Sequence, residues 1–177
     1  MPKTDAEIIK AAKEDLSHFK PLYQKWVSPV YRYFLHRVNN IKEAEDLTSQ
    51  VFLKVIERLP TYRENGTFPA WLFTIAHHQR VDHLRSNIAV LPLEDITVKS
   101  LSDDLLDQAI KAGEYTKLRE LIRLLPENEQ ELIRLRFVAM LSYREIALVL
   151  KRKPDAVRKK IFRLLDKLED QLEDNYV

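Results

Sequence analysis

The stretch LSYREIALVLKRKPDAVRKKIFRLL, residues 141–165, contains two amphipathic patterns separated by a short basic turn. Ser142 and Glu145 have the S-x-x-E spacing of a capping box, which predicts a helix over residues 143–150. Pro154 suits the first position of a second helix. The inward-facing positions of that helix, at helical spacing, are Val157, Ile161, Leu164 and Leu168. Two helices joined by so short a turn describe a helix-turn-helix motif.

Positive charge gathers on the second of these helices and on the turn before it. Between residues 151 and 167, eight basic side chains stand against two acidic ones. Such a block favours phosphate binding through counterion release, and a helix fits the major groove of duplex DNA, where long side chains reach base edges. The ordinary alternative is a solvated helix face. The capping box, the short turn and the one-sided charge favour DNA contact here.

The composition of the whole chain favours helices and excludes several functional classes. The 177 residues are 45% hydrophobic, include two glycines and no cysteine, and carry a formal net charge of +2. This length allows one domain or two small ones. No apolar run is long enough to span a bilayer and the N-terminus lacks the apolar core of a signal peptide, so we expect a cytoplasmic protein without membrane insertion. Without cysteine, thiolate nucleophiles and Cys-based zinc sites are excluded.

The first half reads as a helical unit. Apolar residues recur at helical spacing from residue 16 to residue 38, which predicts a long core helix with a kink at Pro21 or Pro29. A second helical pattern follows and ends at Pro60. Its inward positions are Ala44, Leu47, Val51, Val55 and Leu59.

A turn-rich loop and a third helix complete this half. Residues 61–70 contain Asn65-Gly66, a turn signal, and Pro69, which can open the helix that we expect from Trp71 to about Arg85. Its expected inward residues are Trp71, Leu72, Ile75, Ala76 and Leu84. Its expected outward residues are Gln79, Arg80, His83 and Arg85.

Between residues 88 and 110 the periodicity weakens, and five acidic residues stand against one base. This composition suits a tether, and helical patterning resumes after Gly113. We therefore predict an all-α protein of two small helical domains, residues 1–87 and 114–177, joined by a flexible acidic linker, residues 88–113. The C-terminal domain is the helix-turn-helix.

Three segments in this order resemble a known family: EAEDLTSQVFLKVIERL (43–59), GTFPAWLFTIAHHQRVDHLR (66–85), and LPENEQELIRLRFVAMLSYREIALVL (125–150) with AVRKKIFRLLDKL (156–168). The chain resembles the extracytoplasmic-function sigma factors, the small two-domain class of promoter-specificity subunits of bacterial RNA polymerase. The resemblance implies core RNA polymerase, promoter DNA and an anti-sigma factor as partners. It also implies a tether that runs through polymerase channels.

The resemblance assigns roles to three sets of residues. The helix that would dock on core polymerase carries Asp46, Leu47, Gln50, Val51 and Phe52. The residues that would open the minus-ten element and capture a flipped base are Tyr62, Arg63, Asn65, Thr67, Phe68, Trp71, His77, His78, Arg80 and Arg85. The residues that would contact the minus-thirty-five duplex are Arg144, Lys153, Asp155, Arg158, Lys159, Lys160 and Arg163.

The sequence departs from the family pattern at three places. Gln50 stands where Glu is frequent, and His77 and His78 stand where the family usually has Arg and Asn. The turn KRKPDAV, residues 151–157, lacks the usual Gly-x-Ser. Since Asn donates and accepts in a fixed geometry while a neutral His does one at each nitrogen, we expect an unusual base preference at the minus-ten element.

Two other functions remain as alternatives. A stand-alone helix-turn-helix regulator explains the last third equally well, but gives no reason for the Asp46 helix, the loop before Trp71 and the acidic tether to occur together. His78 and Asp82, at i and i+4, have a spacing that binds metals on one helical face. A metal enzyme would need a third ligand, and no nucleophile-and-base or phosphate-loop signature appears, so we predict no catalytic residue, no metal and no cofactor.

Overall fold

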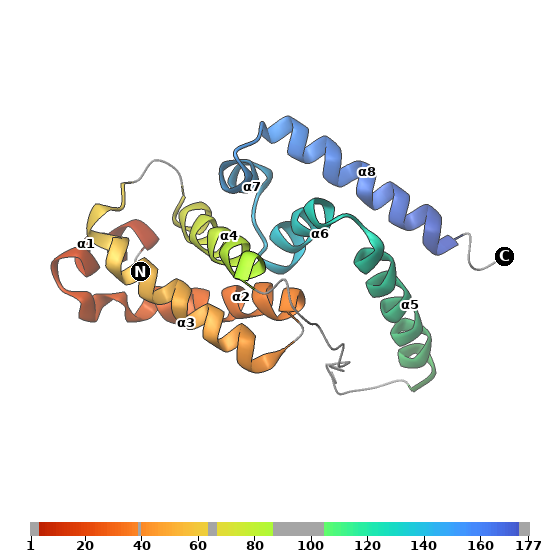
Figure 1. Cartoon of the computed structure of the whole chain (residues 1–177), viewed down its shortest axis with the longest axis horizontal. Helices are drawn as coiled ribbons and strands as arrows, with labels where there is room; N and C mark the ends of the chain where they lie inside the picture. Colours follow the sequence, from red (N-terminus) through yellow and green to blue (C-terminus); the bar gives the residue numbers. More distant parts are fainter. Residues whose placement is uncertain (1–3, 39, 64–66, 87–104, 174–177) are drawn as a thin grey trace.

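The computed structural model describes residues 4–38, 40–63, 67–86 and 105–173, and for residues 82–86 and 105–114 it describes the helical backbone. Within these ranges the chain forms helices and short connections and contains no strand (Figure 1). The predicted all-α fold class is confirmed. None of the described helices is long and apolar enough to cross a lipid bilayer.

The first unit is a bundle of four helices. They are α1 (Asp5–Glu14), α2 (Lys20–Val38), α3 (Ile41–Arg58) and α4 (Phe68–Ser86). Local side-chain caps start two of them, since Thr4 and Glu7 form a capping box at α1 and the Asn40 carboxamide accepts the Glu43 N–H at 3.0 Å. Pro60 lies in the short 3-10 turn Leu59–Thr61 that follows α3, as its ring predicts.

The long first helix begins later than the apolar pattern predicts. The Asp15 carboxylate accepts the Ser17 N–H at 2.9 Å and starts a separate 3-10 turn, Leu16–Phe19, and α2 then continues through Pro29. Leu16 and Tyr23 are 49% and 42% exposed, so their expected place in the buried stripe is wrong. Tyr23 instead packs edge-on against Phe52 at a ring-centroid distance of 4.8 Å.

The second unit contains α5 (Leu105–Leu124), α6 (Glu127–Ile133), α7 (Tyr143–Leu150) and α8 (Pro154–Glu173). A π-helical turn, Arg134–Val138, continues α6. Helix α5 begins at Leu105 and includes Gly113, so the last part of the predicted linker is helical; residues 88–104 lie outside the described residues. Leu, Ile and Ala at this end of the linker outweigh the effect of Asp107 and Gly113 on helix formation.

The capping box in the opening sequence is confirmed. The Glu145 carboxylate accepts the Ser142 N–H at 2.8 Å and the Ser142 hydroxyl accepts the Glu145 N–H at 3.3 Å. Helices α7 and α8 then pack against each other, with the four predicted inward residues of α8 buried. The helix-turn-helix motif predicted from the sequence is confirmed.

The two units pack together through α4 against α7 and through α2 against the turn after α6 (Figure 1). Their buried apolar residues form one continuous cluster. Phe73 and Leu72 of α4 belong to it together with Leu135 and Ile146 of the second unit. The structure therefore shows the two units in a closed arrangement, and it is this closure that decides which charged side chains reach solvent.

Candidate nucleic-acid interface

Helix α8 lies along an outer edge of the molecule (Figure 1), and most of its basic residues are exposed. The amphipathic pattern explains this, because its apolar face packs on α5, α6 and α7 and its opposite face is left to solvent. The exposed residues among those predicted for the upstream duplex are Arg144, Lys153, Asp155, Arg158, Lys159 and Arg163. Five of these six side chains are cationic, so this face can bind the backbone of duplex DNA and place guanidinium groups at base edges.

Lys160, which is also predicted to contact the upstream duplex, is paired with an acidic side chain of the protein. Its ammonium forms an ion pair with Glu129 of α6, and its side chain is 41% exposed. This pair ties the middle of α8 to α6 within the second unit. A DNA phosphate that binds Lys160 therefore has to displace the Glu129 carboxylate.

The turn before α8 begins with a residue other than glycine in the left-handed conformation. Lys151 adopts the left-handed conformation, with φ 52° and ψ 49°, at the end of α7. Its N–H bonds the last turn of α7, and the Arg152 N–H bonds the Ala147 carbonyl at 2.9 Å. A β-carbon in this conformation costs about 1 kcal/mol relative to glycine. The basic turn keeps its shape at that cost and places extra cations beside the recognition helix.

Of the five residues expected to dock on core polymerase, two lie on the surface of α3. Asp46 and Gln50 are exposed, whereas Leu47, Val51 and Phe52 are buried in the core at 4%, 0% and 4% exposure. Their i, i+4 and i+5 spacing places these three residues on the face of α3 that packs against α2 and α4, so their contact with core polymerase stays a prediction.

Gln50 is also linked to α4. Its side-chain oxygen accepts a hydrogen bond from the Gln79 carboxamide, whose own oxygen accepts from the Lys54 ammonium. Gln79, expected to point outward, is buried by this bridge. The neutral Gln50 thus replaces the frequent Glu with a residue that both donates and accepts.

An aromatic cluster forms the base of the loop expected to hold a flipped nucleotide. Tyr62, Phe68 and Trp71 have ring-centroid separations of 4.8 to 6.1 Å. Trp26 of α2 extends the cluster, with its ring 6.5 Å from Phe68. Tyr62 and Phe68 are 7% and 3% exposed, so direct stacking on a base by these two rings is not available in the closed molecule. Trp71 is half-buried at the edge of the cluster.

The other residues of this loop lie in three situations. Arg63 and Thr67 are exposed, and Asn65 lies outside the described residues, as does the side chain of Arg85. The Thr67 hydroxyl donates a hydrogen bond to the Glu145 carboxylate, 2.6 Å away, in the capping box of α7. Burial raises the pKa of Glu145, but the hydrogen bonds from Thr67 and Ser142 outweigh it and leave the pKa below its ordinary value. A residue expected on melted DNA is therefore held by the helix-turn-helix.

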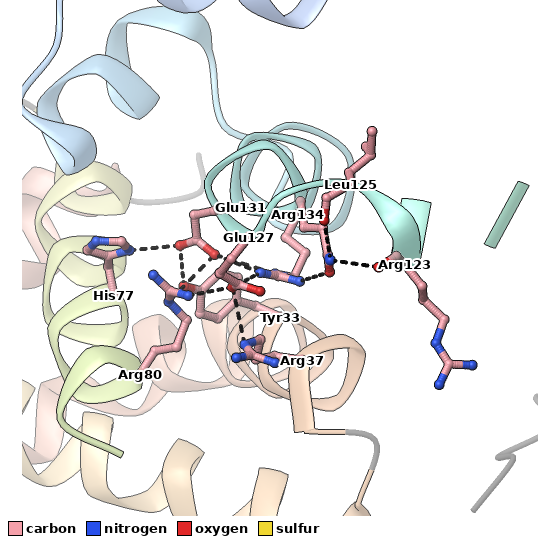
Figure 2. Close-up of polar contacts among 10 residues, drawn as sticks. Tyr33, Arg37, His77, Arg80, Arg123, Leu125, Glu127, Glu131 and Arg134 are labelled. Carbon is pink, nitrogen blue, oxygen red and sulfur yellow. Dashed lines mark hydrogen bonds and ion pairs between the residues drawn. The ribbon is translucent and has the colours of Figure 1, made fainter. Parts of the chain in front are cut away.

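The cations of α4 meet a buried carboxylate of the second unit. Glu131 of α6 is 2% exposed; its Oε1 accepts the Tyr33 hydroxyl at 2.6 Å and lies 2.8 Å from His77 Nδ1 (Figure 2). Its Oε2 lies 3.6 Å from Arg80 Nε and 3.3 Å from Arg134 Nη2. Arg80 is 7% exposed, so the expectation that it faces outward is wrong; His77 is also partly covered, while His78 is exposed.

Glu127, one turn earlier on α6, completes the network. Its Oε1 accepts from Arg80 Nη1 at 2.6 Å, lies 3.2 Å from Arg37 Nε of α2, and also accepts from Arg134 (Figure 2). Two carboxylates thus face three arginines and a histidine that come from α2, α4 and the end of α6. Such a buried network is stable only while each charge keeps its partner.

The electrostatics of the network follow from this balance. Burial raises the pKa of Glu131, but the hydrogen bond from His77, the charges of Arg80 and Arg134 and the hydrogen bond from Tyr33 lower it to about 2. Burial and the Glu131 charge raise the pKa of Tyr33 well above its ordinary value. The carboxylate is therefore ionised, and the phenol a fixed donor, throughout the physiological pH range.

Tyr33, Arg37, Glu127, Glu131 and Arg134 were missed from the sequence. The signal present was the i, i+4, i+7 spacing of Glu127, Glu131 and Arg134, which puts polar groups on one face of a helix. Their partners lie 47 to 98 residues away along the chain, which no local pattern reveals. No group of three or more metal-ligating side chains occurs among the residues described, and the side chain of Asp82, the suggested partner of His78, is outside them.

Comparisons with known proteins identify the family. The model of Sigma-70 region 2 matches residues 22–88, and the model of Sigma-70, region 4 matches residues 115–168. The chain is 30% identical over 174 residues to the ECF RNA polymerase sigma factor BldN of Streptomyces coelicolor, covering 96% of this chain and 66% of BldN. It is 30% identical over 178 residues to the ECF RNA polymerase sigma factor SigD of Mycobacterium tuberculosis, covering 96% of this chain and 84% of SigD.

Solved structures show the same fold. CnrH in complex with the cytosolic domain of CnrY has a TM-score of 0.69 at 18% identity, covering 94% of this chain and 96% of CnrH. The sigma factor RpoE of Bartonella quintana, in complex with the anti-sigma factor NepR, has a TM-score of 0.67 at 16% identity and covers 88% and 96% of the two chains.

A two-unit helical fold with regions 2 and 4 in this order defines a sigma factor of the sigma-70 type. The chain belongs to the extracytoplasmic-function family of RNA polymerase sigma factors. This family identity indicates a transcription factor.

Proposed function

We propose that this chain is an alternative sigma factor that binds core RNA polymerase and directs promoter recognition and DNA melting. The observation that supports it best is the pairing of a region 2 unit with a basic, capped helix-turn-helix on one chain. Its site of action is then wherever RNA polymerase transcribes, which is the cytoplasm. A stand-alone regulator is not favoured, because it leaves the region 2 match over residues 22–88 without a role.

The division of labour that we propose follows the two units. Residues 1–87 bind core polymerase and the melted minus-ten strand, residues 88–113 connect, and residues 114–177 bind the minus-thirty-five duplex. The exposed cations of α8 support the last assignment. Two weak DNA sites held on one polymerase act at high effective concentration, so neither unit alone selects a promoter.

The proposed contacts are narrower than the sequence indicated. On core polymerase they are Asp46 and Gln50, the two exposed residues of the predicted set. On the minus-ten strand they are Arg63, Thr67, Trp71, His77, His78 and Arg80, of which His77 and Arg80 become available once α6 moves away. We also propose an anti-sigma partner, because the neighbours CnrH and RpoE are seen with CnrY and NepR.

The test is run-off transcription on a randomised promoter library with bacterial core RNA polymerase, with and without this protein. Specific transcripts that appear only with the protein support the proposal, and the enriched sequences show what His77 and His78 select. Duplex DNA binding without core binding and without transcripts would overturn it in favour of the regulator.

A further inference from the structure

Three basic side chains of the first unit converge on two glutamates of α6 (Figure 2). Arg37 of α2 and Arg80 of α4 both point at Glu127 Oε1, at 3.2 and 2.6 Å, and His77 of α4 points at Glu131 Oε1, at 2.8 Å. Among the residues that the structure describes, the contacts of these three side chains with acidic groups all lead to Glu127 or Glu131. The second unit therefore supplies both carboxylates, together with Arg134, and the first unit supplies the other basic side chains.

The arrangement of donors is that of an anion site. Glu131 Oε1 accepts a hydrogen bond from Tyr33 of α2 at 2.6 Å and lies 2.8 Å from His77 Nδ1 of α4. Glu127 Oε1 accepts a hydrogen bond from Arg80 of α4 and forms an ion pair with Arg37 of α2. Arg80 is nine-tenths buried beneath the glutamates. A carboxylate oxygen that accepts several charge-assisted hydrogen bonds has the charge and acceptor capacity of a phosphodiester oxygen.

The geometry points to an internal substitute for DNA. We propose that Tyr33, Arg37, His77 and Arg80 form a phosphate-binding site for the melted promoter strand, which Glu127 and Glu131 of α6 occupy while the chain is free of DNA. The inference rests on the proposed function and adds Tyr33 and Arg37 to its DNA-binding residues. It also makes the closed molecule autoinhibited.

The third glutamate of α6 also contacts a basic residue that is proposed to bind DNA. Glu129 pairs with Lys160 of α8, a cation proposed for the upstream duplex. All three acidic residues of this helix are thus on cations of a proposed DNA surface. A salt bridge to an exposed lysine is by itself weak, so the inference depends on the buried carboxylate of Glu131 and on the buried Arg80 that Glu127 also contacts.

Closure and DNA binding are then competing states of one molecule. Moving α6 away exposes Arg37, His77 and Arg80 and leaves them without their anion, so another anion can take the place of the first. A strand phosphate is that replacement. The apparent affinity of the free chain for single-stranded DNA is reduced by the fraction of molecules that are open.

The first experiment removes the internal anion. Glu127→Gln with Glu131→Gln keeps the side-chain size and removes both charges, and Glu120→Gln with Glu169→Gln removes the same charge from exposed positions on α5 and α8. Fluorescence anisotropy with a labelled single-stranded oligonucleotide measures the affinity of each full-length chain. We expect about five- to tenfold tighter binding for the first pair relative to its matched control.

A second variant keeps the test open if the buried substitutions unfold the second unit. Thr67 and Glu145 join the two units through a hydrogen bond of 2.6 Å, and the chain has no cysteine of its own. Thr67→Cys with Glu145→Cys, joined by a short bis-maleimide, locks the closed state. We expect the joined protein to bind the oligonucleotide at least tenfold more weakly than the same protein before joining.

Arg37 distinguishes a phosphate ligand from a residue that only holds α6. In the Glu127→Gln, Glu131→Gln background the ion pair that joins Arg37 to α6 is already lost, so an Arg37 that only holds α6 has no effect there. We expect Arg37→Gln in that background to weaken oligonucleotide binding and to reduce the slope of log affinity against log salt by about 0.7, the value for one phosphate contact on a single strand.

The outcomes separate the inference from the proposed function. Equal affinity of the joined and unjoined cysteine proteins, or no difference between the two glutamine pairs when both fold, would overturn the internal substitute. Run-off transcription with core polymerase is measured on the unsubstituted protein in parallel. If transcripts appear but the joined and unjoined cysteine proteins bind the oligonucleotide equally well, the autoinhibition is contradicted and the sigma assignment stands. If no transcripts appear, the sigma assignment is contradicted.

Discussion

Helices α4 and α8 both carry cations that the sequence assigns to DNA, and they differ in what covers them. The basic residues of α8 lie on its outer face. Among the residues that the structure describes, one of those predicted to contact DNA, Lys160, forms an ion pair, and its partner is Glu129. Arg80 of α4 lies beneath two carboxylates of another unit. The difference teaches that a basic residue indicates a DNA surface only after its neighbours in space are known.

The largest expected effect comes from removing the Glu131 carboxylate, which covers Arg80 of α4. Glu131→Ala removes the buried carboxylate that contacts Arg80 and Arg134 and leaves these two arginines with Glu127 alone, which costs about 3 to 5 kcal/mol of unfolding free energy. Glu129→Ala, on the same helix, removes only a partly exposed pair and costs about 0 to 1 kcal/mol. Urea unfolding followed by circular dichroism measures both. Similar losses for the two variants would contradict the contrast between α4 and α8.

A change of pH separates the same two regions without mutation. The folded-state pKa of Glu131 is lowered from 4.5 to about 2, so the unfolded chain binds more protons between these values. The contribution is fully present above about pH 4.5 and is lost as pH falls toward 2, an effect on the order of 3 kcal/mol.

Urea unfolding at a series of pH values tests this sign. We expect Glu131→Gln to lose stability less steeply than the wild type as the solution is acidified, because this group no longer titrates. A variant of an exposed carboxylate on α8, Glu169→Gln, serves as the control and keeps the wild-type slope. Parallel slopes for all three proteins would show that Glu131 is not held ionised.

On α8 the expected effect lies in binding. Lys159→Ala removes one phosphate contact from an exposed face, so the salt dependence of duplex binding falls by about 0.9 in the slope of log affinity against log salt. Binding to core polymerase stays unchanged, because Lys159 is far from Asp46 in the first unit. An unaltered salt slope in a duplex anisotropy titration would remove Lys159 from the DNA surface.

The smallest expected effect concerns the turn that aims α8. Lys151→Gly relieves the left-handed strain and stabilises the folded chain by less than about 1 kcal/mol, since glycine also gains freedom in the unfolded state. The thermal midpoint measures the gain, with Lys153→Gly, whose conformation is not left-handed, as the control. A lower midpoint for the first variant would show that Lys151 contributes a contact that outweighs its strain.

Local physics made most of the helices predictable. The capping box at Ser142, the stop at Pro60 and the apolar face of α8 depend on residues a few positions apart, and the structure has all three. Helix α1 was missed, although Thr4 and Glu7 show the same capping spacing as Ser142 and Glu145. The start of α5 was placed too late because acidic residues and Gly113 obscured a helical run.

The site was less predictable because burial depends on distant segments. The helical pattern predicted that Gln79 and Arg80 face outward. Gln79 is instead buried where it bridges to Gln50 and Lys54 of α3, and Arg80 is buried beneath Glu127 and Glu131 of α6. Likewise, Leu47, Val51 and Phe52 belong to the helix expected to dock on core polymerase, yet their side chains are part of the core beneath it. The exposure of charged residues on α8 was predictable because none of the described helices packs on its outer face.

The aromatic cluster of the first unit has a spectroscopic use. Both tryptophans of the chain, Trp26 and Trp71, lie in it, and the second unit has neither. Indole emission thus reports on one half of the molecule, while circular dichroism reports on both. Comparing the two signals during unfolding, or during addition of DNA, reveals whether the halves separate before either loses its shape, with no dye attached to the protein.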